Sequence, residues 1–249
     1  MRFGICCSLD EAPAMVDAGF DYVELAASAF ADNPDVYKGL PVEATNIFFA
    51  SSIHLFGPNA TPWRPYVAKL LAAASDQGVK VMVIGSGNAR KAPDAASAAD
   101  CDEQFMDICA EIDSMASEHG MAIAPESLNR EETNVGNDLG RLALGMQARG
   151  SGYTADGYHV LREWRANLPH EPLPDVSLWR EQVPYEPTHV HFADYPRDVP
   201  AEDDEMVLTF FRRLRETGYD DRISFEGSRS GLNPKQILER TRKMWERSC

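Results

Sequence analysis

Four short apolar stretches in the second half of the sequence each lead to a side chain that can bind a metal ion. The first, residues 122–125, leads to Glu126, and the other three end at Asp156, His191 and Glu226. An apolar run of this length that stops at a polar loop is typical of a buried strand. Because each strand delivers its polar side chain at the same end, we expect the four side chains to converge on one site.

Each of these residues alone has a plainer interpretation. Glu126 and Glu226 are also what an ordinary strand end or loop cap contains, and Asp156 stands beside a glycine as a turn residue does. In the pair His189 and His191, the two-residue period of a strand puts both imidazoles on one face. We assign His191 as the ligand because it lies nearer the carboxyl end, and give His189 a structural role. Three carboxylates with one imidazole suit a divalent ion such as Mn2+, with Co2+, Mg2+ or Zn2+ as alternatives.

The rest of the chain repeats the same rhythm of strand and helix. Before the four ligand strands, apolar runs predict strands over residues 3–7, 20–25, 48–55 and 79–84. Helical spacing predicts helices over the intervals 8–19, 33–46, 63–77, 99–119, 132–149, 159–167, 204–217 and 234–247. Prolines make residues 168–187 a rigid connector. Eight such units without a shift in composition predict α/β architecture, a single (β/α)8 TIM barrel over residues 1–249.

Composition excludes several classes of protein. A formal net charge of -15 argues against a nucleic-acid partner, which needs clustered Lys and Arg. No stretch approaches the length of apolar residues that a membrane span requires, and the N-terminal residues are too polar for a signal peptide. The five cysteines form no CxxC pair, which favours reduced thiols. We therefore expect a cytoplasmic protein without nucleic-acid or membrane partners.

Five motifs together resemble the xylose isomerase-like TIM-barrel superfamily of sugar isomerases and epimerases, and within it the ketose 3-epimerases. The motifs are Gly85-Ser-Gly-Asn-Ala-Arg90, Glu126-Ser-Leu-Asn-Arg-Glu-Glu132-Thr-Asn134, Asp156-Gly-Tyr-His159, His189-Val-His191-Phe-Ala-Asp194-Tyr-Pro-Arg197 and Phe225-Glu226. The resemblance covers nearly the whole chain. It departs from the family pattern at residues 198–205, after the Arg, and in the long connector, both of which are places where substrate specificity is set.

The resemblance implies roles for individual residues. Glu126, Asp156, His191 and Glu226 are implied to hold one divalent metal ion. Glu132, His159 and Arg197 stand at the offsets of substrate contacts. Without the resemblance, Arg197 is as readily a surface ion-pair partner of a neighbouring Asp.

Two further residues stand at the ends of predicted strands and could line the substrate pocket, namely His54 and Glu24. We take His54 as a candidate substrate contact, although hydrogen bonding in the core explains each of the two residues equally well.

The implied chemistry is removal of a proton from a carbon next to a carbonyl. A metal stabilises the resulting enediolate as a Lewis acid, and carboxylates move the proton. Strands five and eight lie nearly opposite each other in an eight-stranded ring, so Glu126 and Glu226 would flank a sugar on its two faces as catalytic residues. This arrangement fits epimerisation, most simply at C3 of a ketose.

Several alternatives use the same site or the same fold. An inosose-type dehydratase, a hydroxypyruvate-type aldose–ketose isomerase and a C-glycoside-cleaving relative all need a similar enolate. A sugar-binding barrel without catalysis is an alternative of another class. A DNA-repair endonuclease of this superfamily needs a set of zinc ions and a basic groove, which six histidines and the net charge of -15 disfavour. The resemblance also leads us to expect a homodimer.

Overall fold

The computed structural model describes residues 1–94, 97–160, 183, 185–229 and 231–249. Within these residues eight strands pair in parallel with their neighbours. The strands are β1 (Arg2–Cys6), β2 (Tyr22–Ala26), β3 (Val42–Asn46), β4 (Val81–Ile84), β5 (Ala122–Pro125), β6 (Thr154–Asp156), β7 (His189–Phe192) and β8 (Arg222–Phe225). Seven of the eight overlap the strands that the sequence predicts.

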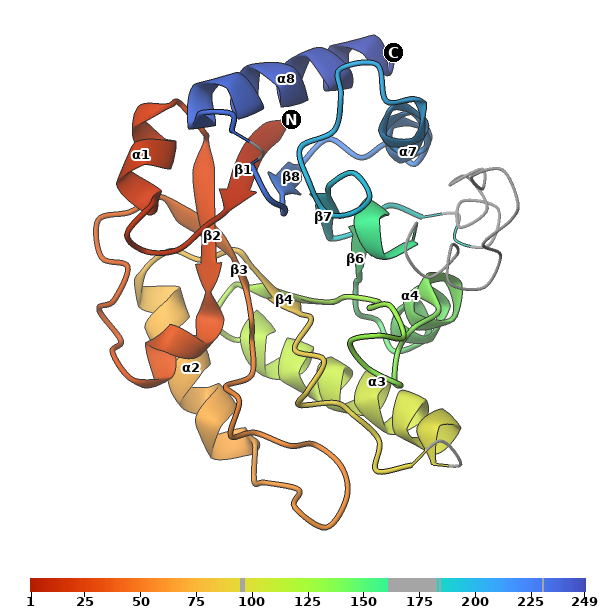
Figure 1. The fold of residues 1–249 in the computed structure, drawn as a ribbon. Helices are drawn as coiled ribbons and strands as arrows, with labels where there is room; N and C mark the ends of the chain where they lie inside the picture. The colour runs from red at the N-terminus through yellow and green to blue at the C-terminus, as the bar shows by residue number, and fades with distance from the viewer. Residues whose placement is uncertain (95–96, 161–182, 184, 230) are drawn as a thin grey trace.

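The strands form an almost complete ring. Their order in the sheet is β5-β4-β3-β2-β1-β8-β7-β6. The two end strands approach each other, because Glu126, just beyond β5, forms a parallel bridge with Thr154 of β6. The Thr154 hydroxyl also donates a hydrogen bond to the carbonyl oxygen of Ala124 at 2.8 Å. The expected (β/α)8 architecture is confirmed, as eight parallel strands in a nearly closed barrel with helices between them (Figure 1).

The helices lie on the outside of the strands (Figure 1). They are α1 (Ala12–Asp17), the 3-10 helix η1 (Ala27–Ala31), α2 (Arg64–Asp76), α3 (Ala98–Ser117), α4 (Leu139–Ala148), α7 (Glu205–Glu216) and α8 (Pro234–Arg247). Local sequence sets their starts. Asn233 and Gln236 form a reciprocal capping box at α8, and the Asp204 side chain accepts from two backbone N–H groups at α7. No helix in the described ranges is both long and apolar enough to cross a membrane.

The third strand is not where the sequence indicated. The predictions of a helix over residues 33–46 and a strand over 48–55 are wrong, because β3 spans Val42–Asn46 and residues 47–63 contain no helix or strand. Strand β3 carries Glu43 and Asn46, so it does not read as an apolar run. The run that does, around Phe48 and Phe49, is buried as a loop whose two rings meet edge to face at 4.9 Å.

Two other expectations differ in extent. The helix predicted over 132–149 begins only at Leu139, since residues 126–138 form a folded loop and the Asp138 carboxylate caps the helix by accepting from the Arg141 N–H at 2.8 Å. The helix predicted over 159–167 and the connector over 168–187 fall largely outside the described residues.

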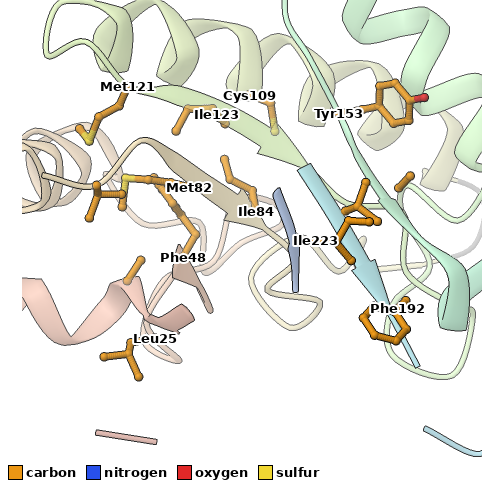
Figure 2. Close-up of a cluster of buried hydrophobic side chains, with 14 of the residues drawn as sticks. Leu25, Phe48, Met82, Ile84, Cys109, Met121, Ile123, Tyr153, Phe192 and Ile223 are labelled. Atoms are coloured by element: carbon orange, nitrogen blue, oxygen red, sulfur yellow. The ribbon is translucent and has the colours of Figure 1, made fainter. Parts of the chain in front are cut away.

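Alternation along each strand separates an outer core from the barrel interior. Outward side chains such as Phe192 and Ile223 join the large apolar cluster between strands and helices, part of which is shown in Figure 2. Inside the barrel, Tyr22, Ala44, Val81 and Ala124 form a separate small cluster. The interior is thus apolar at one level, and the remaining inward positions are free to carry polar groups.

Gly4 provides a test of packing inside the barrel. A Cβ added at Gly4 would lie 2.2 Å from Cζ of the buried Tyr22 ring. We expect Gly4→Ala to lower the free energy of unfolding by about 1–3 kcal/mol, as overpacking does, in a denaturant titration. Combining it with Tyr22→Leu should cost less than the sum of the two single changes, because the clashing ring is gone. Wild-type stability of Gly4→Ala would contradict this account of the interior.

Candidate metal centre

Four potential metal ligands meet at the carboxyl end of the barrel. Glu126 follows β5, Asp156 ends β6, His191 lies in β7 and Glu226 follows β8. One ligand atom from each residue lies within 4.8 Å of the others. Glu126, Asp156 and His191 are buried and Glu226 is partly exposed. Because the strands are parallel and in register, their carboxyl ends deliver these side chains to one place.

His191 lies at the centre of this group. Its Nδ1 is 2.9 Å from Oε1 of Glu126 and 3.3 Å from Oε2 of Glu226. Its other ring nitrogen, Nε2, is 2.8 Å from Oε1 of Glu24. Asp156 is the register partner of His191 between β6 and β7. The imidazole therefore contacts carboxylates on both sides of its ring.

Burial and neighbouring charges shift the pKa values of Asp156, Glu126 and His191 in different directions. Burial raises the pKa of Asp156 to about 6, which outweighs the opposing effects of His159 and Arg197. Burial would also raise the pKa of Glu126, but the charge and hydrogen bond of His191 bring that pKa down to about 2. Burial disfavours the charged form of His191, yet the carboxylates of Glu24 and Glu226 hold its pKa well above the usual value. The protonated imidazole of His191 thus adds positive charge beside the guanidinium of Arg197, which lies 2.6 Å from Glu226.

The donor set fits a divalent cation. Three carboxylates and one imidazole nitrogen offer the hard oxygen and borderline nitrogen donors that Mn2+, Co2+, Mg2+ and Zn2+ accept. The ligand atoms of all four residues already lie close enough together to share one ion. A cation there would take the place of the proton on the imidazole nitrogen that faces the carboxylates.

The residues expected to contact substrate line a cavity beside the four ligands. The cavity has a volume of about 200 Å³, and its walls include Glu126, Glu132, His159, Arg197 and Glu226. Arg197 reaches Oε2 of Glu226 at 2.6 Å and Oε1 of Glu132 at 3.6 Å. These two ion pairs link the candidate metal ligand Glu226 to the predicted substrate contacts Arg197 and Glu132.

His159 completes the polar wall of the cavity, and the buried Asn129 supports it from behind. The Asn129 side-chain N–H₂ donates to Oε1 of Glu132 at 2.9 Å and lies 3.0 Å from Nδ1 of His159. The other His159 nitrogen, Nε2, is 3.6 Å from Oδ2 of Asp156. His54 does not join the cavity walls, since it lies in the loop after β3, where its backbone exchanges hydrogen bonds with Thr61.

Two glycines after β4 leave room for the site. In sequence alone, two glycines after a strand are typical of an ordinary turn. A Cβ on Gly85 would lie 2.8 Å from Oε2 of Glu126, and one on Gly87 would lie 2.9 Å from the Glu132 carbonyl oxygen. The turn therefore permits close approach of the backbone to two site residues.

The cavity wall also holds unusual backbone conformations. Among the described residues, Ile47, Ser86 and Arg197 are the non-glycine residues with positive φ, at 43°, 39° and 84°. All three line the same cavity. Such conformations cost about 1–3 kcal/mol each and cluster where function requires them. Ile47 is also 55% exposed although it is a large apolar side chain.

Two buried charged residues, Arg90 and Glu24, support the site from behind. Arg90 is fully buried, donates from Nη1 to the Glu126 carbonyl oxygen at 2.8 Å and stacks over Phe105 at 4.6 Å. Burial lowers its pKa to about 10. Glu24 is fully buried and contacts His189 and His191. The signal for Glu24 was available, since a carboxylate inside the apolar run 20–25 is a polar group in a buried strand.

Comparison with known proteins places this arrangement in a family. Among curated proteins none matches the sequence. Similar solved structures include D-psicose 3-epimerase from Clostridium cellulolyticum H10 with D-tagatose, at 15% identity and TM-score 0.68 over 100% of this chain and 96% of that one. An L-ribulose 3-epimerase gives 21% identity and TM-score 0.67 over 99% and 91%. The IOLI protein with a bound zinc atom gives 14% identity and TM-score 0.64 over 98% and 96%.

These likenesses concern the fold. The family itself is shown by sequence, because the model of the xylose isomerase-like TIM barrel family matches residues 13–248, nearly the whole chain. The chain belongs to the xylose isomerase-like TIM barrel family.

Proposed function

We propose that this protein is a divalent-metal-dependent sugar epimerase or isomerase, and that its reaction is C3 epimerisation of a ketose. The observation that carries the proposal is the convergence of Glu126, Asp156, His191 and Glu226 beside a cavity lined by further acid–base groups. Similar structures named as 3-epimerases of D-psicose and L-ribulose, and one with bound zinc, support the same reaction class and metal dependence.

The four ligand residues would hold the metal. A bound divalent cation would act as a Lewis acid on the sugar carbonyl and make the neighbouring C–H more acidic. We favour Mn2+ because oxygen donors dominate the set, with Co2+, Mg2+ and Zn2+ also compatible.

The two glutamates supply the proton transfer. Glu126 and Glu226 follow strands that stand three positions apart in the ring, and the His191 imidazole lies between them. One carboxylate accepts the proton from carbon on one face of the sugar, and the other carboxyl group returns a proton on the opposite face. The configuration at that carbon is thereby inverted.

The other polar groups bind and orient the sugar. The Arg197 guanidinium carries a positive charge into the cavity and can donate to the anionic oxygens of the enediolate. Arg197 also stacks over the Tyr158 ring at 4.8 Å, which fixes its plane. Glu132 and His159, held together through Asn129, can bind sugar hydroxyls. A cavity of about 200 Å³ is suited to a single sugar unit.

Metal binding can be tested separately from catalysis. We expect Asp156→Asn to weaken Mn2+ binding at least about tenfold in a calorimetric titration, because a ligand carboxylate becomes a neutral amide. The amide oxygen can still accept from the Tyr158 N–H, as Asp156 does at 2.7 Å, so the local turn is kept. Glu132→Gln is the matched control, since Glu132 is outside the ligand group, and it should bind Mn2+ as the wild type does. Equal affinities for all three proteins would rule out Asp156 as a ligand.

Glu226→Gln tests the proton transfer. With saturating Mn2+, we expect turnover of a ketose to fall by about 10²–10⁴, the usual contribution of a general acid–base group, while sugar binding is largely retained. The measurement is NMR in D2O over a panel of ketoses: epimerisation places one deuterium at the inverted carbon. A new alkene or carbonyl would instead indicate the dehydratase, and an aldose the isomerase. Unchanged turnover in Glu226→Gln would remove this residue from the mechanism.

Ile47 tests whether the strained wall of the cavity serves the substrate. Ile47→Asn should raise the free energy of unfolding by about 1 kcal/mol, because Asn tolerates positive φ far better than a β-branched residue. It should also raise KM for the ketose by removing an apolar contact. Ile47→Val keeps both branch and apolarity, and should match the wild type in both measurements. A less stable Ile47→Asn protein would show that the conformation is not strained.

A further inference from the structure

A second polar layer lies in the barrel interior directly behind the four ligands. Its centre is Glu24 of β2, whose side chain is completely buried. Its Oε1 is 2.8 Å from Nε2 of His191, and its Oε2 is 2.9 Å from Nε2 of His189. The Ser224 hydroxyl donates to Oε2 at 2.6 Å. Three groups from two other strands thus converge on one carboxylate.

The hydrogen bonds fix the direction of donation around Glu24. An ionised carboxylate only accepts, so Ser224 and both imidazole Nε2 atoms must be the donors. The Tyr22 hydroxyl is 2.8 Å from the Ser224 oxygen. Because the Ser224 hydroxyl already donates its hydrogen to Glu24, the Tyr22 hydroxyl is the donor to Ser224. The three groups that contact Glu24 all donate to it, and Tyr22 supports Ser224 from behind, which is what a buried anion requires.

This pattern determines which nitrogen of His191 is left for a metal. If Nε2 carries the hydrogen that Glu24 accepts, the lone pair of the neutral ring is on Nδ1. Nδ1 is the atom that faces the ligand carboxylates, at 2.9 Å from Glu126 and 3.3 Å from Glu226. The tautomer selected by Glu24 is therefore the one that can bind a cation between those carboxylates.

His189 stands differently. Its Nε2 also points to Glu24, and its ring meets that of His191 nearly at right angles, at 86° with centroids 5.0 Å apart. It is absent from the group that could share an ion with Glu126. His189 braces the other oxygen of Glu24 and does not compete for the cation.

We propose that Glu24 is a positioning residue of the metal centre, which holds His191 in the Nε2–H tautomer so that Nδ1 faces the cation. The inference rests on the proposed metal centre but not on the identity of the sugar. It also decides against a second reading, in which Cys6, Glu24 and His191 would themselves hold an ion. Both oxygens of Glu24 are already engaged, and the Cys6 sulfur lies 4.0 Å from Nε2 of His191.

The first measurement is made on the wild-type protein. With ¹⁵N-labelled histidine and Zn2+ as a diamagnetic probe, NMR should show His191 bound through Nδ1, with a slowly exchanging proton on Nε2. Coordination through Nε2 would overturn the inference. Binding of two zinc ions that falls to one in Cys6→Ser would also overturn it, because the group around Glu24 would then be a metal site.

The second measurement compares two variants. Glu24→Gln should weaken Zn2+ binding by about 10–100-fold, as loss of a partner behind a metal-binding imidazole does, and the Nε2 proton of His191 should exchange faster. His189→Gln keeps a donor toward Glu24 and should stay within about threefold of wild-type affinity, well short of the 10–100-fold expected for loss of the Glu24 carboxylate. Circular dichroism is used to check that both variants are folded. If one variant does not fold, the NMR measurement of the His191 tautomer in the wild-type protein still tests the inference.

The outcomes separate this inference from the proposed function. Wild-type affinity in a folded Glu24→Gln protein contradicts the role of Glu24 alone. A wild-type protein that binds no divalent cation contradicts the proposed metal centre itself. Zinc binding through Nδ1 without turnover of any ketose supports Glu24 as a positioning residue and contradicts only the catalytic part of the proposed function.

Discussion

Mutual repulsion of three carboxylates is the constraint on which the rest of this structure depends. Glu126, Asp156 and Glu226 bring their oxygens within 4.8 Å of one another at a largely buried place, where charges interact more strongly than in water. The described structure offsets this repulsion with the imidazole of His191 and the guanidinium of Arg197, which lies 2.6 Å from Glu226. A divalent cation would add two positive charges at the point where they are needed.

The barrel supplies the geometry that such a charged group cannot provide for itself. Asp156 faces His191 in the β6–β7 register, and His191 faces Ser224 in the β7–β8 register. Glu126 is tied to β6 by its bridge with Thr154 at the closure of the ring. Backbone hydrogen bonds between the strands therefore fix the position of each of these residues along the barrel axis. The whole sheet, rather than one flexible loop, holds the carboxylates together against their mutual repulsion.

The fold was predictable because its signals are local and repeat. Apolar runs that end at a turn located seven of the eight strands, and the residues predicted at the carboxyl ends of the last four lie close enough together to share an ion. Strand β3 was missed because Glu43 and Asn46 interrupt its apolar character, while the more apolar Phe48 and Phe49 pack as a loop. The pattern of apolar residues in one sequence indicates which residues are buried, not whether they form a strand. The buried loop around Phe48 and Phe49 therefore has the same apolar pattern as a strand.

The supporting parts of the site were less predictable, for a different reason. Glu24 and Arg90 act through contacts with residues more than thirty positions away, and no local pattern encodes such a partner. Gly85 and Gly87 look like any turn until the positions of Glu126 and Glu132 are known. His54 does not line the cavity, because the stretch 48–55 that was predicted to be a strand is a loop.

The barrel interior has an apolar level and a polar level, which have different roles. At the apolar level, the side chains of Tyr22, Ala44, Val81 and Ala124 pack together and fill the interior. Toward the carboxyl end, apolar residues of similar volume in place of the buried ionic groups would often be as stable or more so. Retaining Glu24 between two imidazoles is therefore hard to explain by stability, whereas it does limit the orientation of His191. The Tyr22 hydroxyl joins the two levels through Ser224, so the packed end of the barrel also anchors the hydrogen bonds that orient the charged end.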